Sequence, residues 1–329
     1  MLRALVTLIL FGLANIASAQ CLGTDLRHSL PAELQKELAA RLAQTPFAEG
    51  NHWMARRDGQ LVHLIGTVHI DDPRLDAPFE RLRPILEAAD RILLEVTPDE
   101  EAALHSALST QPELLLLTDT TLPELLPEED WQALSRAASA RGLPPILVSK
   151  YQPWYLATLL SIPPCAMSTL TGGVAGMDGR IAAFAQENGK ELLSLEAFDT
   201  GMRAFGEMSR DDQIDLLMSS IVPNQTAEDM FATLLATYFA ERHAEAWEVM
   251  RELSVLHAPN SAGDNDPALD KMERALLATR NQTWIPVITA AAAKGGLIVA
   301  AFGAAHLSGP DGVLALLQAR GFTLERQQF

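Results

Sequence analysis

Aromatic and basic residues are scarce in this 329-residue chain. Phe, Trp and Tyr make up 6% of it, and 25 Lys and Arg stand against 42 Asp and Glu, for a formal net charge of −17. Such a surface repels phosphate backbones and anionic headgroups, which disfavours nucleic-acid binding. Several catalytic motifs are also missing: without His-Glu-x-x-His, Gly-x-Ser-x-Gly or a Walker loop, zincins, serine esterases and P-loop enzymes lack support.

The chain also lacks a run of the roughly 20 apolar residues that a helix needs to span a bilayer. Its N-terminus instead has the order of a secretory signal peptide: a positive charge at Arg3, an apolar run over residues 5–14, and small residues at 17–19. We expect cleavage after the last of these, which predicts a periplasmic or secreted protein with no membrane span. A lipoprotein at Cys21 is less favoured, because Gln20 stands where a small residue is needed.

Cysteine is nearly absent: the chain holds only Cys21 and Cys165. Both survive removal of residues 1–19, and in an oxidising compartment two cysteines predict one disulfide, with two unpaired thiols as the alternative. The mature chain, residues 20–329, is long enough for a single large domain with a well-buried core.

Short apolar strands alternate with helices along most of the chain. Asp58-Gly59 lies between two strand-like runs and predicts a hairpin. Further strands are expected at 61–65, 92–94, 192–195, 297–302 and from 322, and helices at 29–44, 78–88, 128–141, 179–188, 226–253, 267–295 and 313–320. This alternation predicts an α/β fold of βα repeats on a mostly parallel central sheet, with a helical insertion at about 200–260.

Four chemistry-bearing side chains lie at or just past the ends of apolar strands: His69, Glu95, Glu196 and His306. Because ligands bind at the carboxyl edge of a parallel sheet, we expect these residues to converge there. Each histidine closes a Gly-x-x-His sequence, in which the glycine lets the backbone leave the strand sharply.

Imidazole and carboxylate together suit a transition metal, and a water bound to such a metal is a nucleophile. The sequence leaves open whether Glu95 is a ligand or the general base, and Glu196 is equally compatible with an ordinary carboxylate facing water. Arg280-Asn281 is either a solvated pair or an inward clamp on a carbonyl or carboxylate. Asp178 stands where a helix N-cap is expected.

An ordered set of short segments resembles the TraB/GumN family, which is related to the Tiki-type metalloproteases. The segments are Leu64–His69, Leu93–Val96, Gln152–Trp154, Gly176–Asp178, Gly189-Lys190, Leu195-Glu196, Arg280-Asn281, Phe302–Gly309, Gly312-Val313 and Arg320–Phe322. The resemblance implies a fold related to the ChaN/EreA-like group and a metal-dependent peptidase site. Carried over to this sequence, His69 and His306 match the metal-site histidines, Glu95 the acidic partner, and Arg280-Asn281 the family's Arg-Asn pair.

We therefore expect an exported metal-dependent hydrolase, a peptidase, acting on a peptide or protein. Its metal, Mn, Co or Zn, is expected on His69, His306 and Glu95, with Glu95, Glu196, Arg280 and Asn281 in the catalytic set. The alternatives are a non-catalytic periplasmic binding protein for haem or another small ligand, and a surface protein that keeps the fold for partner contact. The sequence does not indicate the oligomeric state.

Overall fold

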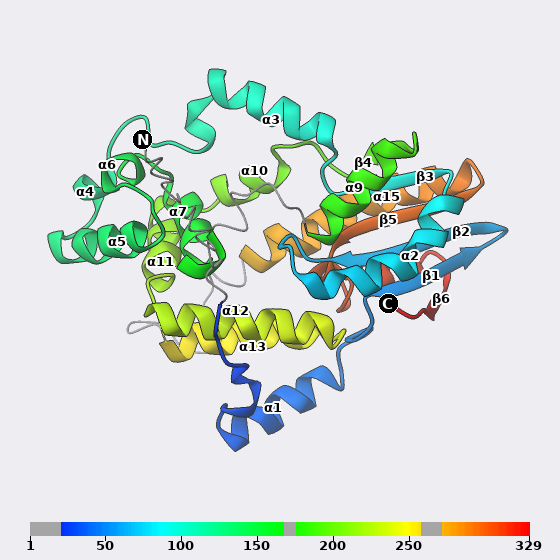
Figure 1. The fold of residues 1–329 in the computed structure, drawn as a ribbon, viewed down its shortest axis with the longest axis horizontal. Coiled ribbons are helices and arrows are strands. Elements are labelled where there is room, and N and C mark those ends of the chain that lie inside the picture. Colours follow the sequence, from blue (N-terminus) through cyan, green and yellow to red (C-terminus); the bar gives the residue numbers. More distant parts are fainter. Residues whose placement is uncertain (1–20, 168–175, 258–271) are drawn as a thin grey trace, which may run out of the picture.

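A six-stranded sheet forms the centre of the protein in the computed structural model, which describes residues 21–167, 176–257 and 272–329 (Figure 1). Its strands, in the order β4-β3-β5-β2-β1-β6, are β1 (His52–Arg57), β2 (Gln60–Thr67), β3 (Arg91–Leu94), β4 (Glu191–Ser194), β5 (Leu297–Gly303) and β6 (Thr323–Arg326). Strands β2, β3, β4 and β5 run parallel, and β1 is antiparallel to both β2 and β6. The predicted α/β fold with a mostly parallel sheet is confirmed.

The β1–β2 hairpin turns at Asp58-Gly59, as predicted. Both residues have positive φ, 48° at Asp58 and 79° at Gly59, which a tight two-residue hairpin turn requires. The central strands β2 and β5 are buried on both faces; Leu64 and Val299, for example, have no exposed surface. Continuous apolar runs such as 297–302 therefore reflect helices on both faces of a parallel sheet.

Helices cover the two faces in pairs: α2 (Asp76–Ala88) with α9 (Met177–Glu187), and α15 (Thr279–Ala293) with α16 (Val313–Gln318). From β2 the chain passes to β3 and then to β4, moving each time toward the β4 edge of the sheet. Right-handed crossovers in this one direction place α2 and α9 on the same face. The chain returns in the opposite direction to β5 and on to β6, which places α15 and α16 on the other face. In Figure 1, α2 lies in front of the sheet and α15 behind it.

The remaining helices form a lobe at the other end of the molecule (Figure 1). They are α3 (Pro98–Thr110), α4 (Leu122–Leu125), α5 (Glu128–Ala140), α6 (Pro145–Val148), α7 (Pro153–Leu160), α10 (Thr200–Gly206), α11 (Arg210–Ser219), α12 (Asn224–Phe239) and α13 (His243–His257), with α1 (Ala32–Leu42) against α13. Short turns are η1 (Leu26–His28), η2 (Pro73–Leu75), η3 (Pro112–Leu114), η4 (Pro164–Ala166), η6 (Ala304–His306) and the π-helical η5 (Arg274–Ala278). Helices α4 to α7 and α11 share an apolar core separate from that under the sheet.

The N-terminal segment is fastened to this helical region. A disulfide joins Cys21 to Cys165, as predicted, with their Cα atoms 5.3 Å apart. Backbone N–H groups of Thr24 and Leu26 donate to Asp229 Oδ1 and Thr233 Oγ1 of α12, at 2.7 and 2.8 Å. The predicted signal peptide lies outside the described residues. Among the helices that the structure describes, none has the length and apolarity needed to cross a bilayer.

Two buried histidines connect the hairpin to the C-terminal tail. His52 Nδ1 donates to the carbonyl of Gln328 at 3.0 Å, so its Nε2 accepts from His63 Nδ1 at 2.9 Å. Burial, with the neighbouring Arg56 charge, lowers the pKa of His63 to about 4. Burial also lowers the pKa of His52, so both rings are neutral in the folded protein at pH 7.

The free energy of unfolding is expected to fall as pH drops from about 6.5 toward 4. Burial also lowers the pKa of His243 to about 4, so in this window the unfolded chain binds protons on His63 and His243 that the folded chain does not. Each histidine contributes a loss of about 1 kcal/mol per pH unit. Urea unfolding at pH 6.5 and 5 should show a smaller loss for His243→Gln than for wild type, and an unchanged loss for the exposed His105→Gln. Equal losses in all three proteins would contradict this role.

Candidate functional site

The four predicted residues gather at the carboxyl edge of the parallel strands. His69 follows β2, Glu95 follows β3, Glu196 follows β4, and His306 lies in η6 after β5. Strands β2 and β5 end level, with Thr67 paired to Gly303 in the parallel register. The chain leaves β2 and β5 toward opposite faces of the sheet, and the crevice at such a switch point is where ligands bind in open α/β folds.

Three side chains from three strands converge on Gly303. The point that a Cβ on Gly303 would occupy lies 3.2 Å from Glu95 Oε1, 3.6 Å from His306 Cδ2 and 3.8 Å from His69 Nε2. The N–H of Gly303 also donates to Glu95 Oε1. Because Gly303 has no side chain, residue 303 places no atom at the point between the two imidazoles and the carboxylate.

The imidazole of His306 is held in one orientation by a hydrogen bond at its Nδ1. This Nδ1 donates to Asn281 Oδ1 at 2.6 Å, and the Asn281 amide donates in turn to the carbonyl of Asp311 at 2.9 Å. This leaves the lone pair on Nε2, which lies 3.9 Å from Glu95 Oε1. Burial, together with the Arg280 and His69 charges, outweighs Glu95 and lowers the pKa of His306 to about 3. The ring is therefore neutral at pH 7.

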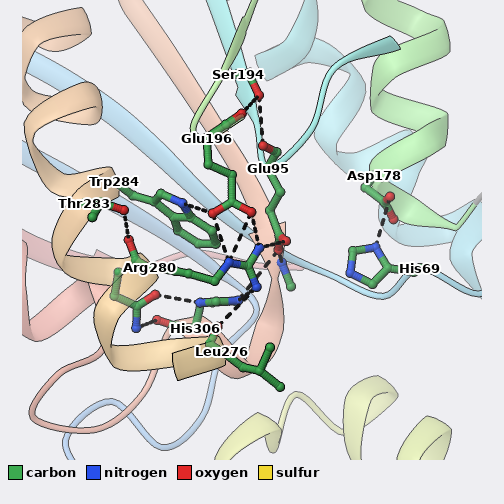
Figure 2. Close-up of polar contacts among 12 residues, drawn as sticks. His69, Glu95, Asp178, Ser194, Glu196, Leu276, Arg280, Thr283, Trp284 and His306 are labelled. Carbon is green, nitrogen blue, oxygen red and sulfur yellow. Dashed lines mark hydrogen bonds and ion pairs between the residues drawn. The ribbon is translucent and has the colours of Figure 1, made fainter. Parts of the chain in front are cut away.

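His69 lies nearer to solvent, with 62% of its side chain exposed. Its Nδ1 donates to Asp178 Oδ2 at 3.1 Å (Figure 2), and its Nε2 lies 3.8 Å from the point that a Cβ on Gly303 would occupy. Desolvation lowers the pKa of His69, but the hydrogen bond and charge of Asp178, with the charge of Glu95, outweigh it and raise the pKa above its ordinary value. A cation bound here would have to displace a proton from this ring.

Arg280 of α15 joins the two carboxylates. Its Nε and Nη2 donate to Glu196, the shortest of these bonds being 2.6 Å, and Nη2 also donates to Glu95 Oε2 at 2.8 Å. Trp284, one helical turn further along, donates from Nε1 to Glu196 Oε2 at 2.8 Å. The side chain of Glu196 is thus buried, and both of its oxygens accept hydrogen bonds from Arg280 or Trp284. This arrangement fits a residue that fixes Arg280 better than one that accepts a proton.

Glu95 is ionised at neutral pH. Burial raises its pKa, but the charges of His69 and Arg280 and the N–H of Gly303 outweigh burial and lower the pKa well below its ordinary value. A carboxylate with so low a pKa is a weak proton acceptor. It is well suited to facing a positive charge.

Two residues of this cluster were not assigned to the site from the sequence. Trp284 packs on His306, with ring centroids 4.3 Å apart, and its place one turn after Arg280 was a usable signal. The prediction that Asp178 caps a helix was wrong: Gly176 is the N-cap of α9, and Asp178 lies in the first turn, where it contacts His69. Only the packing of α9 beside the loop after β2 reveals that contact.

The donor chemistry of this edge fits a divalent transition metal. In the described part of the chain, no three His, Cys, Asp or Glu side chains are arranged, as they stand, to hold a metal ion. Both imidazoles nevertheless have Nδ1 engaged by an oxygen, from Asn281 or Asp178, and Nε2 directed to the open side, as metal-binding histidines do. Gly303 leaves the room between them that a side chain would fill.

Comparison with known proteins identifies the family of the chain. A model described as the TraB/PrgY/gumN family matches residues 51–326, which include the whole sheet and every residue of the site. Among curated proteins, none matches the chain.

Proposed function

The chain belongs to the TraB/PrgY/gumN family, and on this premise we propose that it is an exported metal-dependent hydrolase that cleaves peptides. The observation that carries the proposal is the convergence of His69, His306 and Glu95 on Gly303, with both histidines held through Nδ1. Export is supported by the Cys21–Cys165 disulfide, because such bonds persist in oxidising compartments. The peptide substrate follows from the family resemblance.

The charge balance of the site supports a bound cation. The carboxylates of Glu95, Glu196 and Asp178 stand against two positive charges, the guanidinium of Arg280 and the protonated ring of His69, while His306 is neutral. The site therefore has one excess negative charge, which a cation would offset. His69, His306 and Glu95 would hold the ion, whose candidates by ligand type are Mn, Co and Zn.

A bound divalent ion would supply a water of lowered pKa and polarise a substrate carbonyl. The protein's own groups then have separate tasks. Asn281 sets the tautomer of His306, and Glu196 with Trp284 fixes Arg280. Arg280 Nη1 lies 3.5 Å from His306 Nε2, where its positive charge can stabilise an oxyanion that develops on the substrate. The low pKa of Glu95 favours it as ligand over base.

Metal analysis of the purified mature protein tests the proposal. We expect about one equivalent of a divalent transition metal, lost in the His69→Ala/His306→Ala double variant and kept in the exposed His105→Ala control. A wild-type protein that carries no such metal and recovers none on incubation with Mn²⁺, Co²⁺ or Zn²⁺ would refute it. Visible absorbance that saturates on haem titration would favour the ligand-binding alternative instead.

Gly303→Ala is expected to lower metal affinity and peptide cleavage by about 10- to 100-fold. The backbone of Gly303 has φ −49°, which alanine adopts freely, so the added methyl acts by crowding Glu95 Oε1 at 3.2 Å. Isothermal titration with Zn²⁺ and a fluorogenic peptide assay measure the two effects. Gly201→Ala, in α10 with open space around it, is the matched control. Wild-type affinity in Gly303→Ala would show that this space is not used.

A further inference from the structure

The first turn of α9 is built against the backbone of the loop that carries His69. A Cβ on Gly176 would lie 2.0 Å from the carbonyl oxygen of Val68 and 2.5 Å from the carbonyl carbon of His69, so only glycine fits at that contact. The N–H of Met177 donates to the same Val68 carbonyl at 3.0 Å. The start of α9 therefore determines where the backbone at His69 lies.

The same helix holds the loop beyond His69. Arg180, one turn along α9, donates to Asp71 at 2.7 Å and to Asp76 at 2.6 Å. Asp71 is largely buried, with 19% of its side chain exposed, and Asp76 begins α2. Arg180 thereby ties the loop between β2 and α2 to α9 at two points after His69.

Between these contacts lies the hydrogen bond from His69 to Asp178. Asp178 Oδ2 accepts from the ring, while Oδ1 is buried and has no hydrogen-bond partner among the described residues. The ring of His69, by contrast, is 62% exposed, so packing constrains it less than it constrains the buried ring of His306. Its direction depends on Asp178, and the position of Asp178 relative to the loop depends on the contacts of Arg180.

We infer that Asp178 and Arg180 are positioning residues, which direct His69 Nε2 toward Gly303. Asp178 acts on the ring, and Arg180 acts through Asp71 and Asp76 on the loop. Exposed and half-exposed ion pairs add little to global stability. Loss of either residue should therefore change the placement of His69 far more than the melting temperature. The effect on metal binding rests on the proposed function, whereas the effect on the ring does not.

Two variants and a control test this. Asp178→Asn and Arg180→Gln remove one charge each with little change of shape, and Arg210→Gln breaks a comparable exposed pair with Asp119 in the helical lobe. Ring ¹⁵N spectra of the metal-free proteins, with His69 assigned by its absence in His69→Gln, report the histidine directly. We expect a shifted or broadened His69 signal in Asp178→Asn and Arg180→Gln, and a wild-type signal in Arg210→Gln.

Zn²⁺ titration gives a second readout. We expect about 10- to 100-fold weaker binding in Asp178→Asn and about 10-fold in Arg180→Gln, the range for outer partners of a metal ligand. Arg180→Lys should restore little of the Zn²⁺ affinity, since a single ammonium group replaces a guanidinium that donates to two carboxylates. Melting temperatures should stay within a few degrees of wild type.

The outcomes separate the two proposals. If wild type binds no metal but the His69 signal changes in the variants, the proposed function fails and the positioning role stands. If the His69 signal and Zn²⁺ affinity of both variants match wild type, the positioning role is refuted. A melting temperature lowered equally in all three variants, with no selective change at His69, would mark the contacts as structural only.

Discussion

His306→Ala is expected to reduce peptide cleavage by about a thousandfold or more, because a bound metal contributes several kcal/mol of transition-state stabilisation and the variant would lose one of its ligands. The ring is almost completely buried, its Nδ1 is bonded to Asn281, and its Nε2 faces Glu95. Alanine would leave Asn281 Oδ1 without its imidazole partner and open a gap beside Trp284. The measurements are a fluorogenic peptide assay and metal analysis of the same preparation.

The far-UV circular dichroism of His306→Ala should stay close to wild type. The change deletes one side chain at a loop after β5, and the unsatisfied Asn281 oxygen costs about 1–3 kcal/mol, which lowers the melting temperature without unfolding the sheet. Asn281→Ala is a matched second variant that keeps the imidazole but frees its tautomer. It should retain more activity than His306→Ala. Undiminished cleavage by folded His306→Ala would reject the role assigned to this residue.

Loss of the disulfide is expected to destabilise the protein by about 5 kcal/mol. The bond closes a loop between Cys21 and Cys165, which are 144 residues apart. In the chain-entropy model a 100-residue loop is worth about 4.7 kcal/mol, and a longer loop somewhat more. A loss of this size is a large part of the roughly 5–15 kcal/mol that stabilises most domains. Urea unfolding of wild type and Cys21→Ser/Cys165→Ser measures it.

Dithiothreitol provides the control for this experiment. It should lower the unfolding midpoint of wild type toward that of the double serine variant and leave the variant unchanged. The hydrogen bonds from Thr24 and Leu26 to α12 do not involve sulfur, so they remain available in both forms. If dithiothreitol leaves the unfolding midpoint of wild type unchanged, the N-terminal segment is held by these contacts and not by the covalent bond.

Much of the fold could be read from local patterns. The hairpin at Asp58-Gly59, the continuous apolar strands and the helix at 128–141, observed as α5 (Glu128–Ala140), all follow from turn chemistry and hydrophobic periodicity within a few residues. The resemblance drawn from short segments agrees with the family match over 51–326. The order of the sheet could not be read in this way. Strand β5 lies between β2 and β3, and nothing local in residues 297–303 specifies those neighbours.

The sequence by itself determined the α/β class and the residue types that end the strands, because both follow from short-range spacing. Only the tertiary structure decided which of these residues meet. It set Glu196 against Arg280 and Trp284 as an anchor, left Glu95 beside the two imidazoles, and brought Asp178 to His69 across 109 positions of chain. Such pairings depend on sheet order and on the face to which each crossover returns, and these arise only when distant segments pack together.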